Sequence, residues 1–209
     1  MVLYGYYRST ATYRVRIALG LKGLPWVNAP VNLLKGEQGA EAFRQLNPQG
    51  RVPVLLLEDG EALMQSCAIL EYLDACYPCP PLLPEGALEQ ARVRGVAALI
   101  GCDIHPLHNA AVLKALRHLG LDEGAVNAWI AHWVGEGLAA VESLIDSSEG
   151  YCFGPAPGLA DLYLIPQLYA AQRFQVGLEA YPKIRAVAAQ AATHPAFIAA
   201  HPSCQVDAP

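Results

Sequence analysis

The sequence predicts two domains, a mixed α/β domain of order β-α-β-α-β-β-α followed by a domain made only of helices. In the first 80 residues, short apolar runs with strand composition alternate with runs of helical period, and beyond residue 88 no strand pattern recurs. A proline-rich stretch at 78–84 separates the two patterns. We therefore expect one domain over 1–80, a linker over 81–87 and a helical domain over 88–209.

The first domain is expected to hold a mixed four-stranded sheet. Its predicted strands are 2–7, 26–33, 52–57 and 61–63, and its predicted helices are 13–21, 37–46 and 66–77. The first β-α-β unit requires parallel strands, whereas Asp59-Gly60 is typical of an antiparallel hairpin. Helices should cover both faces of this sheet.

The second domain is expected to hold four helical stretches, at 89–119, 122–145, 158–174 and 181–193. Pro106 predicts a break or kink in the first of these, and Pro166 an interruption in the third. The tail after His201 has no regular pattern and is expected to be irregular.

Composition excludes several classes of protein. Apolar residues make up 54% of the 209 residues and charged residues 16%, so the chain can bury a large core and is not expected to be disordered. The net charge is −5 and the basic residues are scattered, which argues against nucleic-acid binding. Neither a transmembrane helix nor a secretory signal is evident, so we expect a cytoplasmic protein with no membrane partner.

The six cysteines are expected to be reduced in such a protein. Cys76 and Cys79 form a C-x-x-C motif, which a redox pair would use. A redox pair normally follows a strand at a helix N-terminus, where its thiol pKa falls, whereas this motif ends a helical pattern. No second such motif and no H-x-x-x-H pair completes a zinc site, and the H-x-x-H pair His105 and His108 has no evident third ligand, so no metal is predicted.

The segment 8–19, Arg-Ser-Thr-Ala-Thr-Tyr-Arg-Val-Arg-Ile-Ala-Leu, resembles the signature of the zeta-class glutathione transferases, which include maleylacetoacetate and maleylpyruvate isomerases. The resemblance extends over nearly the whole chain, through the motifs at 46–49, 52–53, 65–66, 102–106, 159–161, 166–167, 173–174 and 201–203. It implies the glutathione transferase fold, with a thioredoxin-like first domain, glutathione as cofactor and a homodimer.

One position departs from the family pattern. The signature usually reads Arg-Ser-Ser-Cys, whereas Thr10 and Ala11 stand in the last two places here. The departure keeps the Ser9 hydroxyl but removes the cysteine that reductive dehalogenation of aromatic rings would use in this family.

Ser9 is the candidate for activating the glutathione thiol. A free thiol has a pKa near 8.5, so about a few per cent is thiolate at neutral pH. A hydroxyl donor at the start of the helix, together with the positive potential of that helix end, would favour the thiolate. Thr10 is the second candidate. The alternative is that Ser9 only caps the helix.

The resemblance also implies the residues that bind glutathione. A cis Val52–Pro53 bond would turn the backbone of Val52 toward the cysteinyl unit, and Gln65-Ser66 would hold the γ-glutamyl end. His105 and Asn109, four apart on one helical face, would reach the glycine end. The full candidate set is Ser9, Ala11, Gln38, Gln49, Val52, Pro53, Gln65, Ser66, His105 and Asn109. The alternatives are an ordinary trans bond, a simple helix cap and a structural histidine.

Arg8 and Arg173 are candidates for holding a second substrate, because the guanidinium fork binds a carboxylate in a bidentate manner. The alternative for each is a surface salt bridge. Asp161, three residues after Gly158, is assigned to a capping box and hence to folding.

The expected function is a glutathione-dependent cis–trans isomerisation of a maleyl-keto acid in the catabolism of aromatic compounds. The thiolate would add to the cis double bond, rotation would follow, and the thiolate would leave from the trans product. Two alternatives remain open: a general conjugating transferase, and a glutathione-binding module without activity. The sequence leaves the choice of maleyl-keto acid and the dimer interface open.

Overall fold

The computed structural model describes all 209 residues, and the chain divides into two compact units. The first comprises Met1–Pro81 together with Thr193–Pro209, and the second comprises Leu82–Ala192. The boundary therefore falls at the start of the predicted linker. The helical domain expected over 88–209 is wrong at its end, because the last residues of the chain belong to the first unit.

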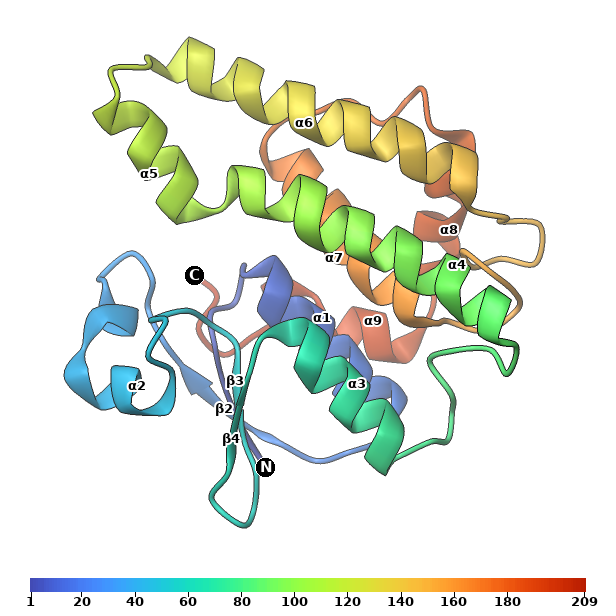
Figure 1. Cartoon of the computed structure of the whole chain (residues 1–209), viewed down its shortest axis with the longest axis horizontal. Helices are drawn as coiled ribbons and strands as arrows, with labels where there is room; N and C mark the ends of the chain where they lie inside the picture. The colour runs from blue at the N-terminus through green and yellow to red at the C-terminus, as the bar shows by residue number, and fades with distance from the viewer. The chain divides into compact units, whose positions relative to one another are not determined.

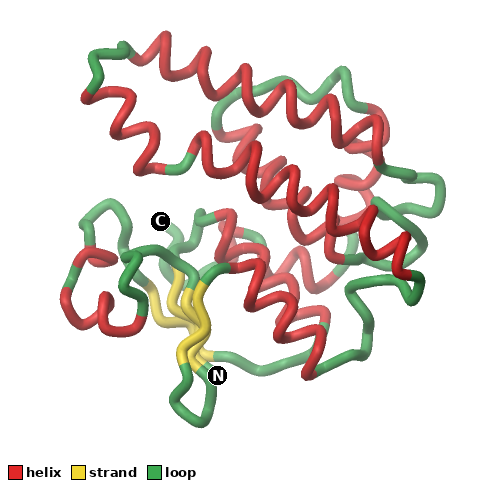
Figure 2. Tube along the Cα trace, in the orientation of Figure 1, coloured by secondary structure: helices red, strands yellow, loops and turns green.

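The first unit contains a four-stranded sheet with strand order β2-β1-β3-β4 (Figures 1 and 2). The strands are β1 (Val2–Gly5), β2 (Val27–Pro30), β3 (Val54–Leu56) and β4 (Ala62–Met64). Strands β1 and β2 are parallel, and the other two pairs are antiparallel. The mixed sheet predicted from the sequence is confirmed, with strands shorter than expected.

Alternating side chains of the sheet face two layers of helix. Leu3 and Leu55 form a cross-strand pair on one face and are almost completely buried. On the other face, Phe43 of the short helix α2 (Glu41–Leu46) packs in a cluster with Val54 and Tyr4, and its ring meets that of Tyr4 edge to face at 6.3 Å. The predicted helix 37–46 is thus split, since 37–39 form a 3-10 turn.

Three helices of the first unit lie together on one side of the sheet (Figure 1). They are α1 (Thr10–Leu21), α3 (Ser66–Cys76) and α9 (Pro195–Ala200). Helix α9 was not predicted, and it packs directly on α1: a Cβ at Gly20 would lie 3.2 Å from the Cβ of Ala196. The rest of the tail forms a short 3-10 turn over 202–204.

The second unit is entirely helical apart from isolated bridges, as expected. Its helices are α4 (Ala87–Ala98), α5 (Ala110–His118), α6 (Glu123–Leu144), α7 (Leu159–Arg173) and α8 (Pro182–Ala191). A π-helical turn (Leu99–Ile104) and a 3-10 turn (His105–His108) separate α4 from α5, which confirms the break predicted at Pro106. By contrast, α7 continues through Pro166, so the predicted interruption is wrong.

Residues 87–118 form one succession of helical turns that could cross a membrane by length and composition alone, with a mean hydropathy of 1.3 in the most apolar window. Core helices of soluble proteins meet the same criterion.

The N-terminus of α7 is held by a buried carboxylate. Asp161 is 1% exposed and accepts hydrogen bonds from the backbone N–H groups of Gly158 at 2.8 Å and Cys152 at 2.9 Å. Burial raises the pKa of this carboxyl. The predicted bond from Asp161 back to the N-cap Gly158 is confirmed, although glycine has no side chain to complete the capping box.

Replacing Asp161 with Ala should destabilise the protein by about 2–4 kcal/mol, because it leaves two backbone donors without acceptors in a buried site. The matched control is Asp122→Ala, which removes the exposed cap of α6 and its single bond to Ala125, and should cost about 1 kcal/mol. Chemical denaturation measures both. Equal losses would contradict the role of burial at Asp161.

Candidate active site

The topology of the sheet brings three candidate segments of the first unit to one edge. Tyr4, Val54 and Met64 are aligned as neighbours across β1, β3 and β4. Because β1 runs antiparallel to β3, and β3 to β4, the end of β1, the start of β3 and the end of β4 lie at the same edge. Ser9 follows β1, Val52–Pro53 precedes β3, and Gln65–Ser66 follows β4.

Ser9 is the N-cap of α1. Its backbone is extended, and its Oγ accepts a hydrogen bond from the N–H of Thr12 at 3.2 Å. Since Oγ acts as the acceptor in this contact, the hydroxyl proton is available for donation to a thiolate. The capping role and the proposed catalytic role are therefore compatible. Thr10, in contrast, is 6% exposed, which makes it the less accessible of the two hydroxyls.

The turn that carries Ser9 is well defined. The Ser9 N–H donates to the carbonyl of Tyr6 at 3.0 Å, which closes a β-turn with Tyr7 and Arg8 at its centre. The Arg8 guanidinium lies 5.6 Å from the ring centroid of Tyr6 and 6.0 Å from that of Tyr7. Burial raises the pKa of the Tyr6 phenol, although the charge on Arg8 partly opposes this effect. Arg8 is therefore placed beside Ser9 by local packing rather than by a carboxylate partner.

The Val52–Pro53 bond is cis, as the resemblance implies. Neither the amide nor the carbonyl of Val52 makes a hydrogen bond within the chain. Val52 lies just before the central strand β3, and its free donor and acceptor can both pair with an extended peptide ligand.

Gln65 has an unusual backbone conformation, with φ of 68° and ψ of 116°. This region is costly for a residue other than glycine. Its Nε2 donates to Oε1 of Gln49 at 2.7 Å, so the turn residue Gln49 is joined to this segment. The next residue, Ser66, is the first of α3, and its Oγ accepts from Nη1 of the buried Arg14 at 3.3 Å. A side-chain hydrogen bond thus joins the start of α3 to α1.

Gln38 lies in the 3-10 turn before α2. Its Oε1 is buried and has no hydrogen-bond partner. Its backbone carbonyl faces Gly50, where a Cβ would approach to 3.0 Å. Ala11 is the second residue of α1 and lies two residues after the Ser9 cap in sequence.

In the second unit, the expected helical face of His105 and Asn109 is wrong. His105 begins a 3-10 turn, whereas Asn109 is extended, with φ of −70° and ψ of 157°. Asn109 is the N-cap of α5, and its Oδ1 accepts from the N–H groups of Ala111 and Val112. The physical reason is that Pro106 cannot donate to the preceding turn, so the helix ends and restarts. Only the Nδ2 donor of Asn109 remains for a ligand.

Near His105, the side chains of His108 and Gln167 form a buried hydrogen-bonded pair. His108 is 4% exposed, and its Nε2 lies 3.0 Å from Nε2 and 3.1 Å from Oε1 of the Gln167 amide. The ring centroids of His105 and His108 lie 5.6 Å apart in an edge-to-face arrangement.

Arg173, at the end of α7, is exposed and places its guanidinium 4.3 Å from the ring centroid of Phe174. Each of these contacts lies within the second unit.

Two further residues of the first unit escaped the sequence analysis. Arg14 and Arg16 are 3% and 2% exposed, so α1 carries two guanidinium groups into the interior. A signal for them was present: an arginine at these positions of an otherwise apolar helix must find polar partners. The sequence alone does not say which partners those are.

All six cysteines are free thiols, Cys76 and Cys79 among them, and no group of three or more metal-ligating side chains is present.

Known proteins of one family are similar to this chain. The family model described as glutathione S-transferase, N-terminal domain, matches residues 3–81. A maleylacetoacetate isomerase of Pseudomonas aeruginosa is 62% identical, with 100% of this chain and 99% of that protein covered.

Two solved structures are also similar. A holo maleylpyruvate isomerase, a bacterial zeta-class glutathione S-transferase, has a TM-score of 0.96 at 46% identity, with both chains fully covered. A maleylacetoacetate isomerase of Anaeromyxobacter dehalogenans with dicarboxyethyl glutathione and citrate in its active site has a TM-score of 0.89 at 42% identity, covering 99% of this chain and 96% of that one.

The strained backbone of Gln65 yields a test. Gln65→Gly should stabilise the protein by up to about 1 kcal/mol, because glycine tolerates a positive φ, and should weaken glutathione binding about tenfold by removing the amide. The control Gln49→Ala removes the partner amide without changing the φ of residue 65, and should not stabilise. Thermal unfolding and calorimetric titration with glutathione measure the two effects. Tighter binding by the glycine variant would contradict a ligand role for this residue.

Proposed function

Since this chain belongs to the zeta class of the glutathione transferases, we propose that it isomerises a maleyl-keto acid, maleylpyruvate or maleylacetoacetate, to the fumaryl isomer with glutathione as cofactor. The observation that carries the proposal is the meeting of Ser9, Val52–Pro53 and Gln65–Ser66 at one sheet edge, with a hydroxyl donor at the N-terminus of α1. Related enzymes with glutathione or a glutathione derivative in the active site support the cofactor.

The first unit supplies the groups that would hold glutathione. The unpaired backbone of Val52 suits the cysteinyl unit, and the first turn of α3 at Ser66 offers N–H groups to a carboxylate. Gln65, Gln49, Gln38 and Ala11 complete the proposed contacts in this unit. From the second unit we propose His105 and the Nδ2 group of Asn109.

Bound glutathione supplies a thiolate that adds reversibly to the cis double bond, which permits rotation before the thiolate leaves. Ser9 holds that thiolate by donating its hydroxyl proton, and the N-terminus of α1 adds positive potential. Arg8 and Arg173 are proposed to bind the carboxylates of the substrate and to stabilise the negative charge that develops on its keto group.

A conjugating transferase is the second candidate, because the same thiolate could add irreversibly to other electrophiles. The direct test incubates the protein with maleylpyruvate or maleylacetoacetate, with and without glutathione, and follows loss of the cis and appearance of the trans isomer. We expect conversion only with glutathione, and no net consumption of the thiol. Stoichiometric loss of glutathione would favour conjugation, and binding without either reaction would favour a binding module.

We further propose that the protein is a cytoplasmic homodimer. Five of its six free cysteines are exposed, which suits a reducing compartment. Sedimentation equilibrium at micromolar concentration measures the mass, and a monomer would contradict the dimer.

Replacing Ser9 with Ala should lower kcat about 100- to 1,000-fold, the usual cost of removing one hydrogen-bond donor to a developing or resident anion. Stability should fall by only about 1 kcal/mol through the lost cap. Ser9→Thr keeps a hydroxyl and should retain most activity. Thr10→Ala is the matched control, and a larger loss in that variant than in Ser9→Ala would move thiol activation to Thr10.

Replacing Arg173 with Ala should raise KM for the maleyl-keto acid about tenfold, because one carboxylate loses its bidentate partner, while the Kd of glutathione stays unchanged. Arg8→Ala should behave in the same way. Arg185→Ala, an exposed arginine on α8, is the control. Steady-state kinetics with a neutral electrophile as comparison substrate completes the test, since an equal rise in KM for it would exclude carboxylate recognition.

A further inference from the structure

The last residues of the chain reach the turn that carries Ser9. Asp207, third from the end, accepts a hydrogen bond on Oδ2 from the backbone N–H of Tyr7 at 2.8 Å. Tyr7 lies in the β-turn Tyr6–Ser9, two residues before Ser9. The tail after α9 therefore contacts the loop from which the candidate catalytic hydroxyl projects.

The carbonyl of Tyr7 is bound by the buried guanidinium of Arg16. Nη2 of Arg16 donates to the carbonyl of Tyr7 at 2.8 Å, and its Nε donates to the carbonyl of Ala200 at 3.0 Å. Arg16 is 2% exposed and lies 5.4 Å from the ring centroid of Tyr13. Both backbone polar groups of Tyr7 are thus fixed by charged side chains, one from the tail and one from α1.

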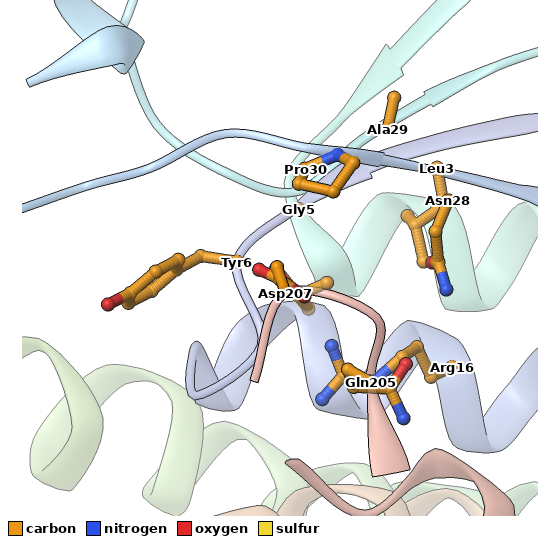
Figure 3. A pocket seen from close by; sticks show the side chains of 10 residues that line it. Leu3, Gly5, Tyr6, Arg16, Asn28, Ala29, Pro30, Gln205 and Asp207 are labelled. Atoms are coloured by element: carbon orange, nitrogen blue, oxygen red, sulfur yellow. The ribbon is translucent and has the colours of Figure 1, made fainter. Parts of the chain in front are cut away.

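The tail is itself anchored. Nε2 of Gln205, a largely buried residue, donates to the carbonyls of Ala199 and His201, both at 2.9 Å. Figure 3 shows Gln205 and Asp207 on the tail, with Arg16 beside them, lining one small pocket. Gly5 lines the same pocket, and a Cβ there would lie 2.3 Å from Cγ2 of Thr12, so the end of β1 and the first turn of α1 are in close contact.

We propose that Asp207 and Arg16 are positioning residues for Ser9: by fixing the two successive peptide groups on either side of the Tyr7 Cα, they make the C-terminal tail part of the apparatus that ionises the glutathione thiol. This inference rests on the proposed function of Ser9. A hydroxyl stabilises a thiolate only when its donor direction is fixed, because a misplacement of about 1 Å can cost two orders of magnitude in rate. Two charge-assisted hydrogen bonds are well suited to hold a turn of four residues.

The test is Asp207→Ala in the full-length protein. It should lower kcat about tenfold and raise the pKa of the bound glutathione thiol, which is read from thiolate absorbance in the ultraviolet. The Kd of glutathione should change less than about threefold, because the hydrogen bond of Asp207 is made to Tyr7, and the proposed contacts at Val52 and Ser66 are left intact. Asp207→Asn keeps an oxygen acceptor for the Tyr7 N–H and should restore most of both quantities.

Val206→Ala is the matched control, since Val206 is 77% exposed and adjacent in the tail. Gln205→Ala loosens the tail without touching the turn and should shift kcat and thiol pKa in the same direction as Asp207→Ala. That variant carries the test if Asp207→Ala does not fold, which circular dichroism establishes.

A wild-type thiol pKa and kcat in Asp207→Ala would overturn the proposal, as would an equal loss in Asp207→Asn. These outcomes differ from a failure of the proposed function, in which the wild-type protein itself would not ionise glutathione or convert the maleyl substrate.

Discussion

The β-turn from Tyr6 to Ser9 is the feature on which the candidate site depends. One backbone hydrogen bond, from the Ser9 N–H to the Tyr6 carbonyl, converts the end of β1 into the start of α1. The turn makes Ser9 the cap of α1, with its oxygen engaged by Thr12 and its proton available. The sheet topology then places the other two segments. Because β3 runs antiparallel to β1, and β4 antiparallel to β3, Val52 before β3 and Gln65 after β4 must lie at the same end of the sheet as Ser9.

Stability and binding make opposite demands at this edge. The Val52 backbone keeps both of its polar groups unpaired, and Gln65 holds a φ of 68°. The φ of Gln65 is unfavourable for a residue other than glycine, and the two polar groups of the Val52 backbone are available to a peptide-like ligand. The buried carboxylate of Asp161, by contrast, accepts hydrogen bonds from two backbone donors.

Much of the fold could be predicted from the sequence, because periodicity and turn residues are local signals. The strand and helix order, the hairpin at Asp59-Gly60 and the break at Pro106 all follow from short windows. What could not be predicted depends on partners distant in the chain. Arg16 reaches Ala200, and Asp207 reaches Tyr7, across about two hundred residues. Asn109 was misplaced for a related reason: once the helix stops at Pro106, its side chain becomes a cap instead of a surface group. The residues of the candidate site were predicted mainly through the family resemblance. The buried arginines Arg14 and Arg16, which hold the segments around that site, were not predicted.

In the mechanism proposed for this protein, Ser9 and the N-terminus of α1 lower the pKa of the glutathione thiol. The most direct measurement is the ultraviolet absorbance of thiolate in the wild-type complex with glutathione as a function of pH. A bound thiol that is mostly ionised at neutral pH, with a pKa below about 7, is the predicted result, compared with about 8.5 for a free thiol. A bound thiol that titrates at its free value would contradict the claim.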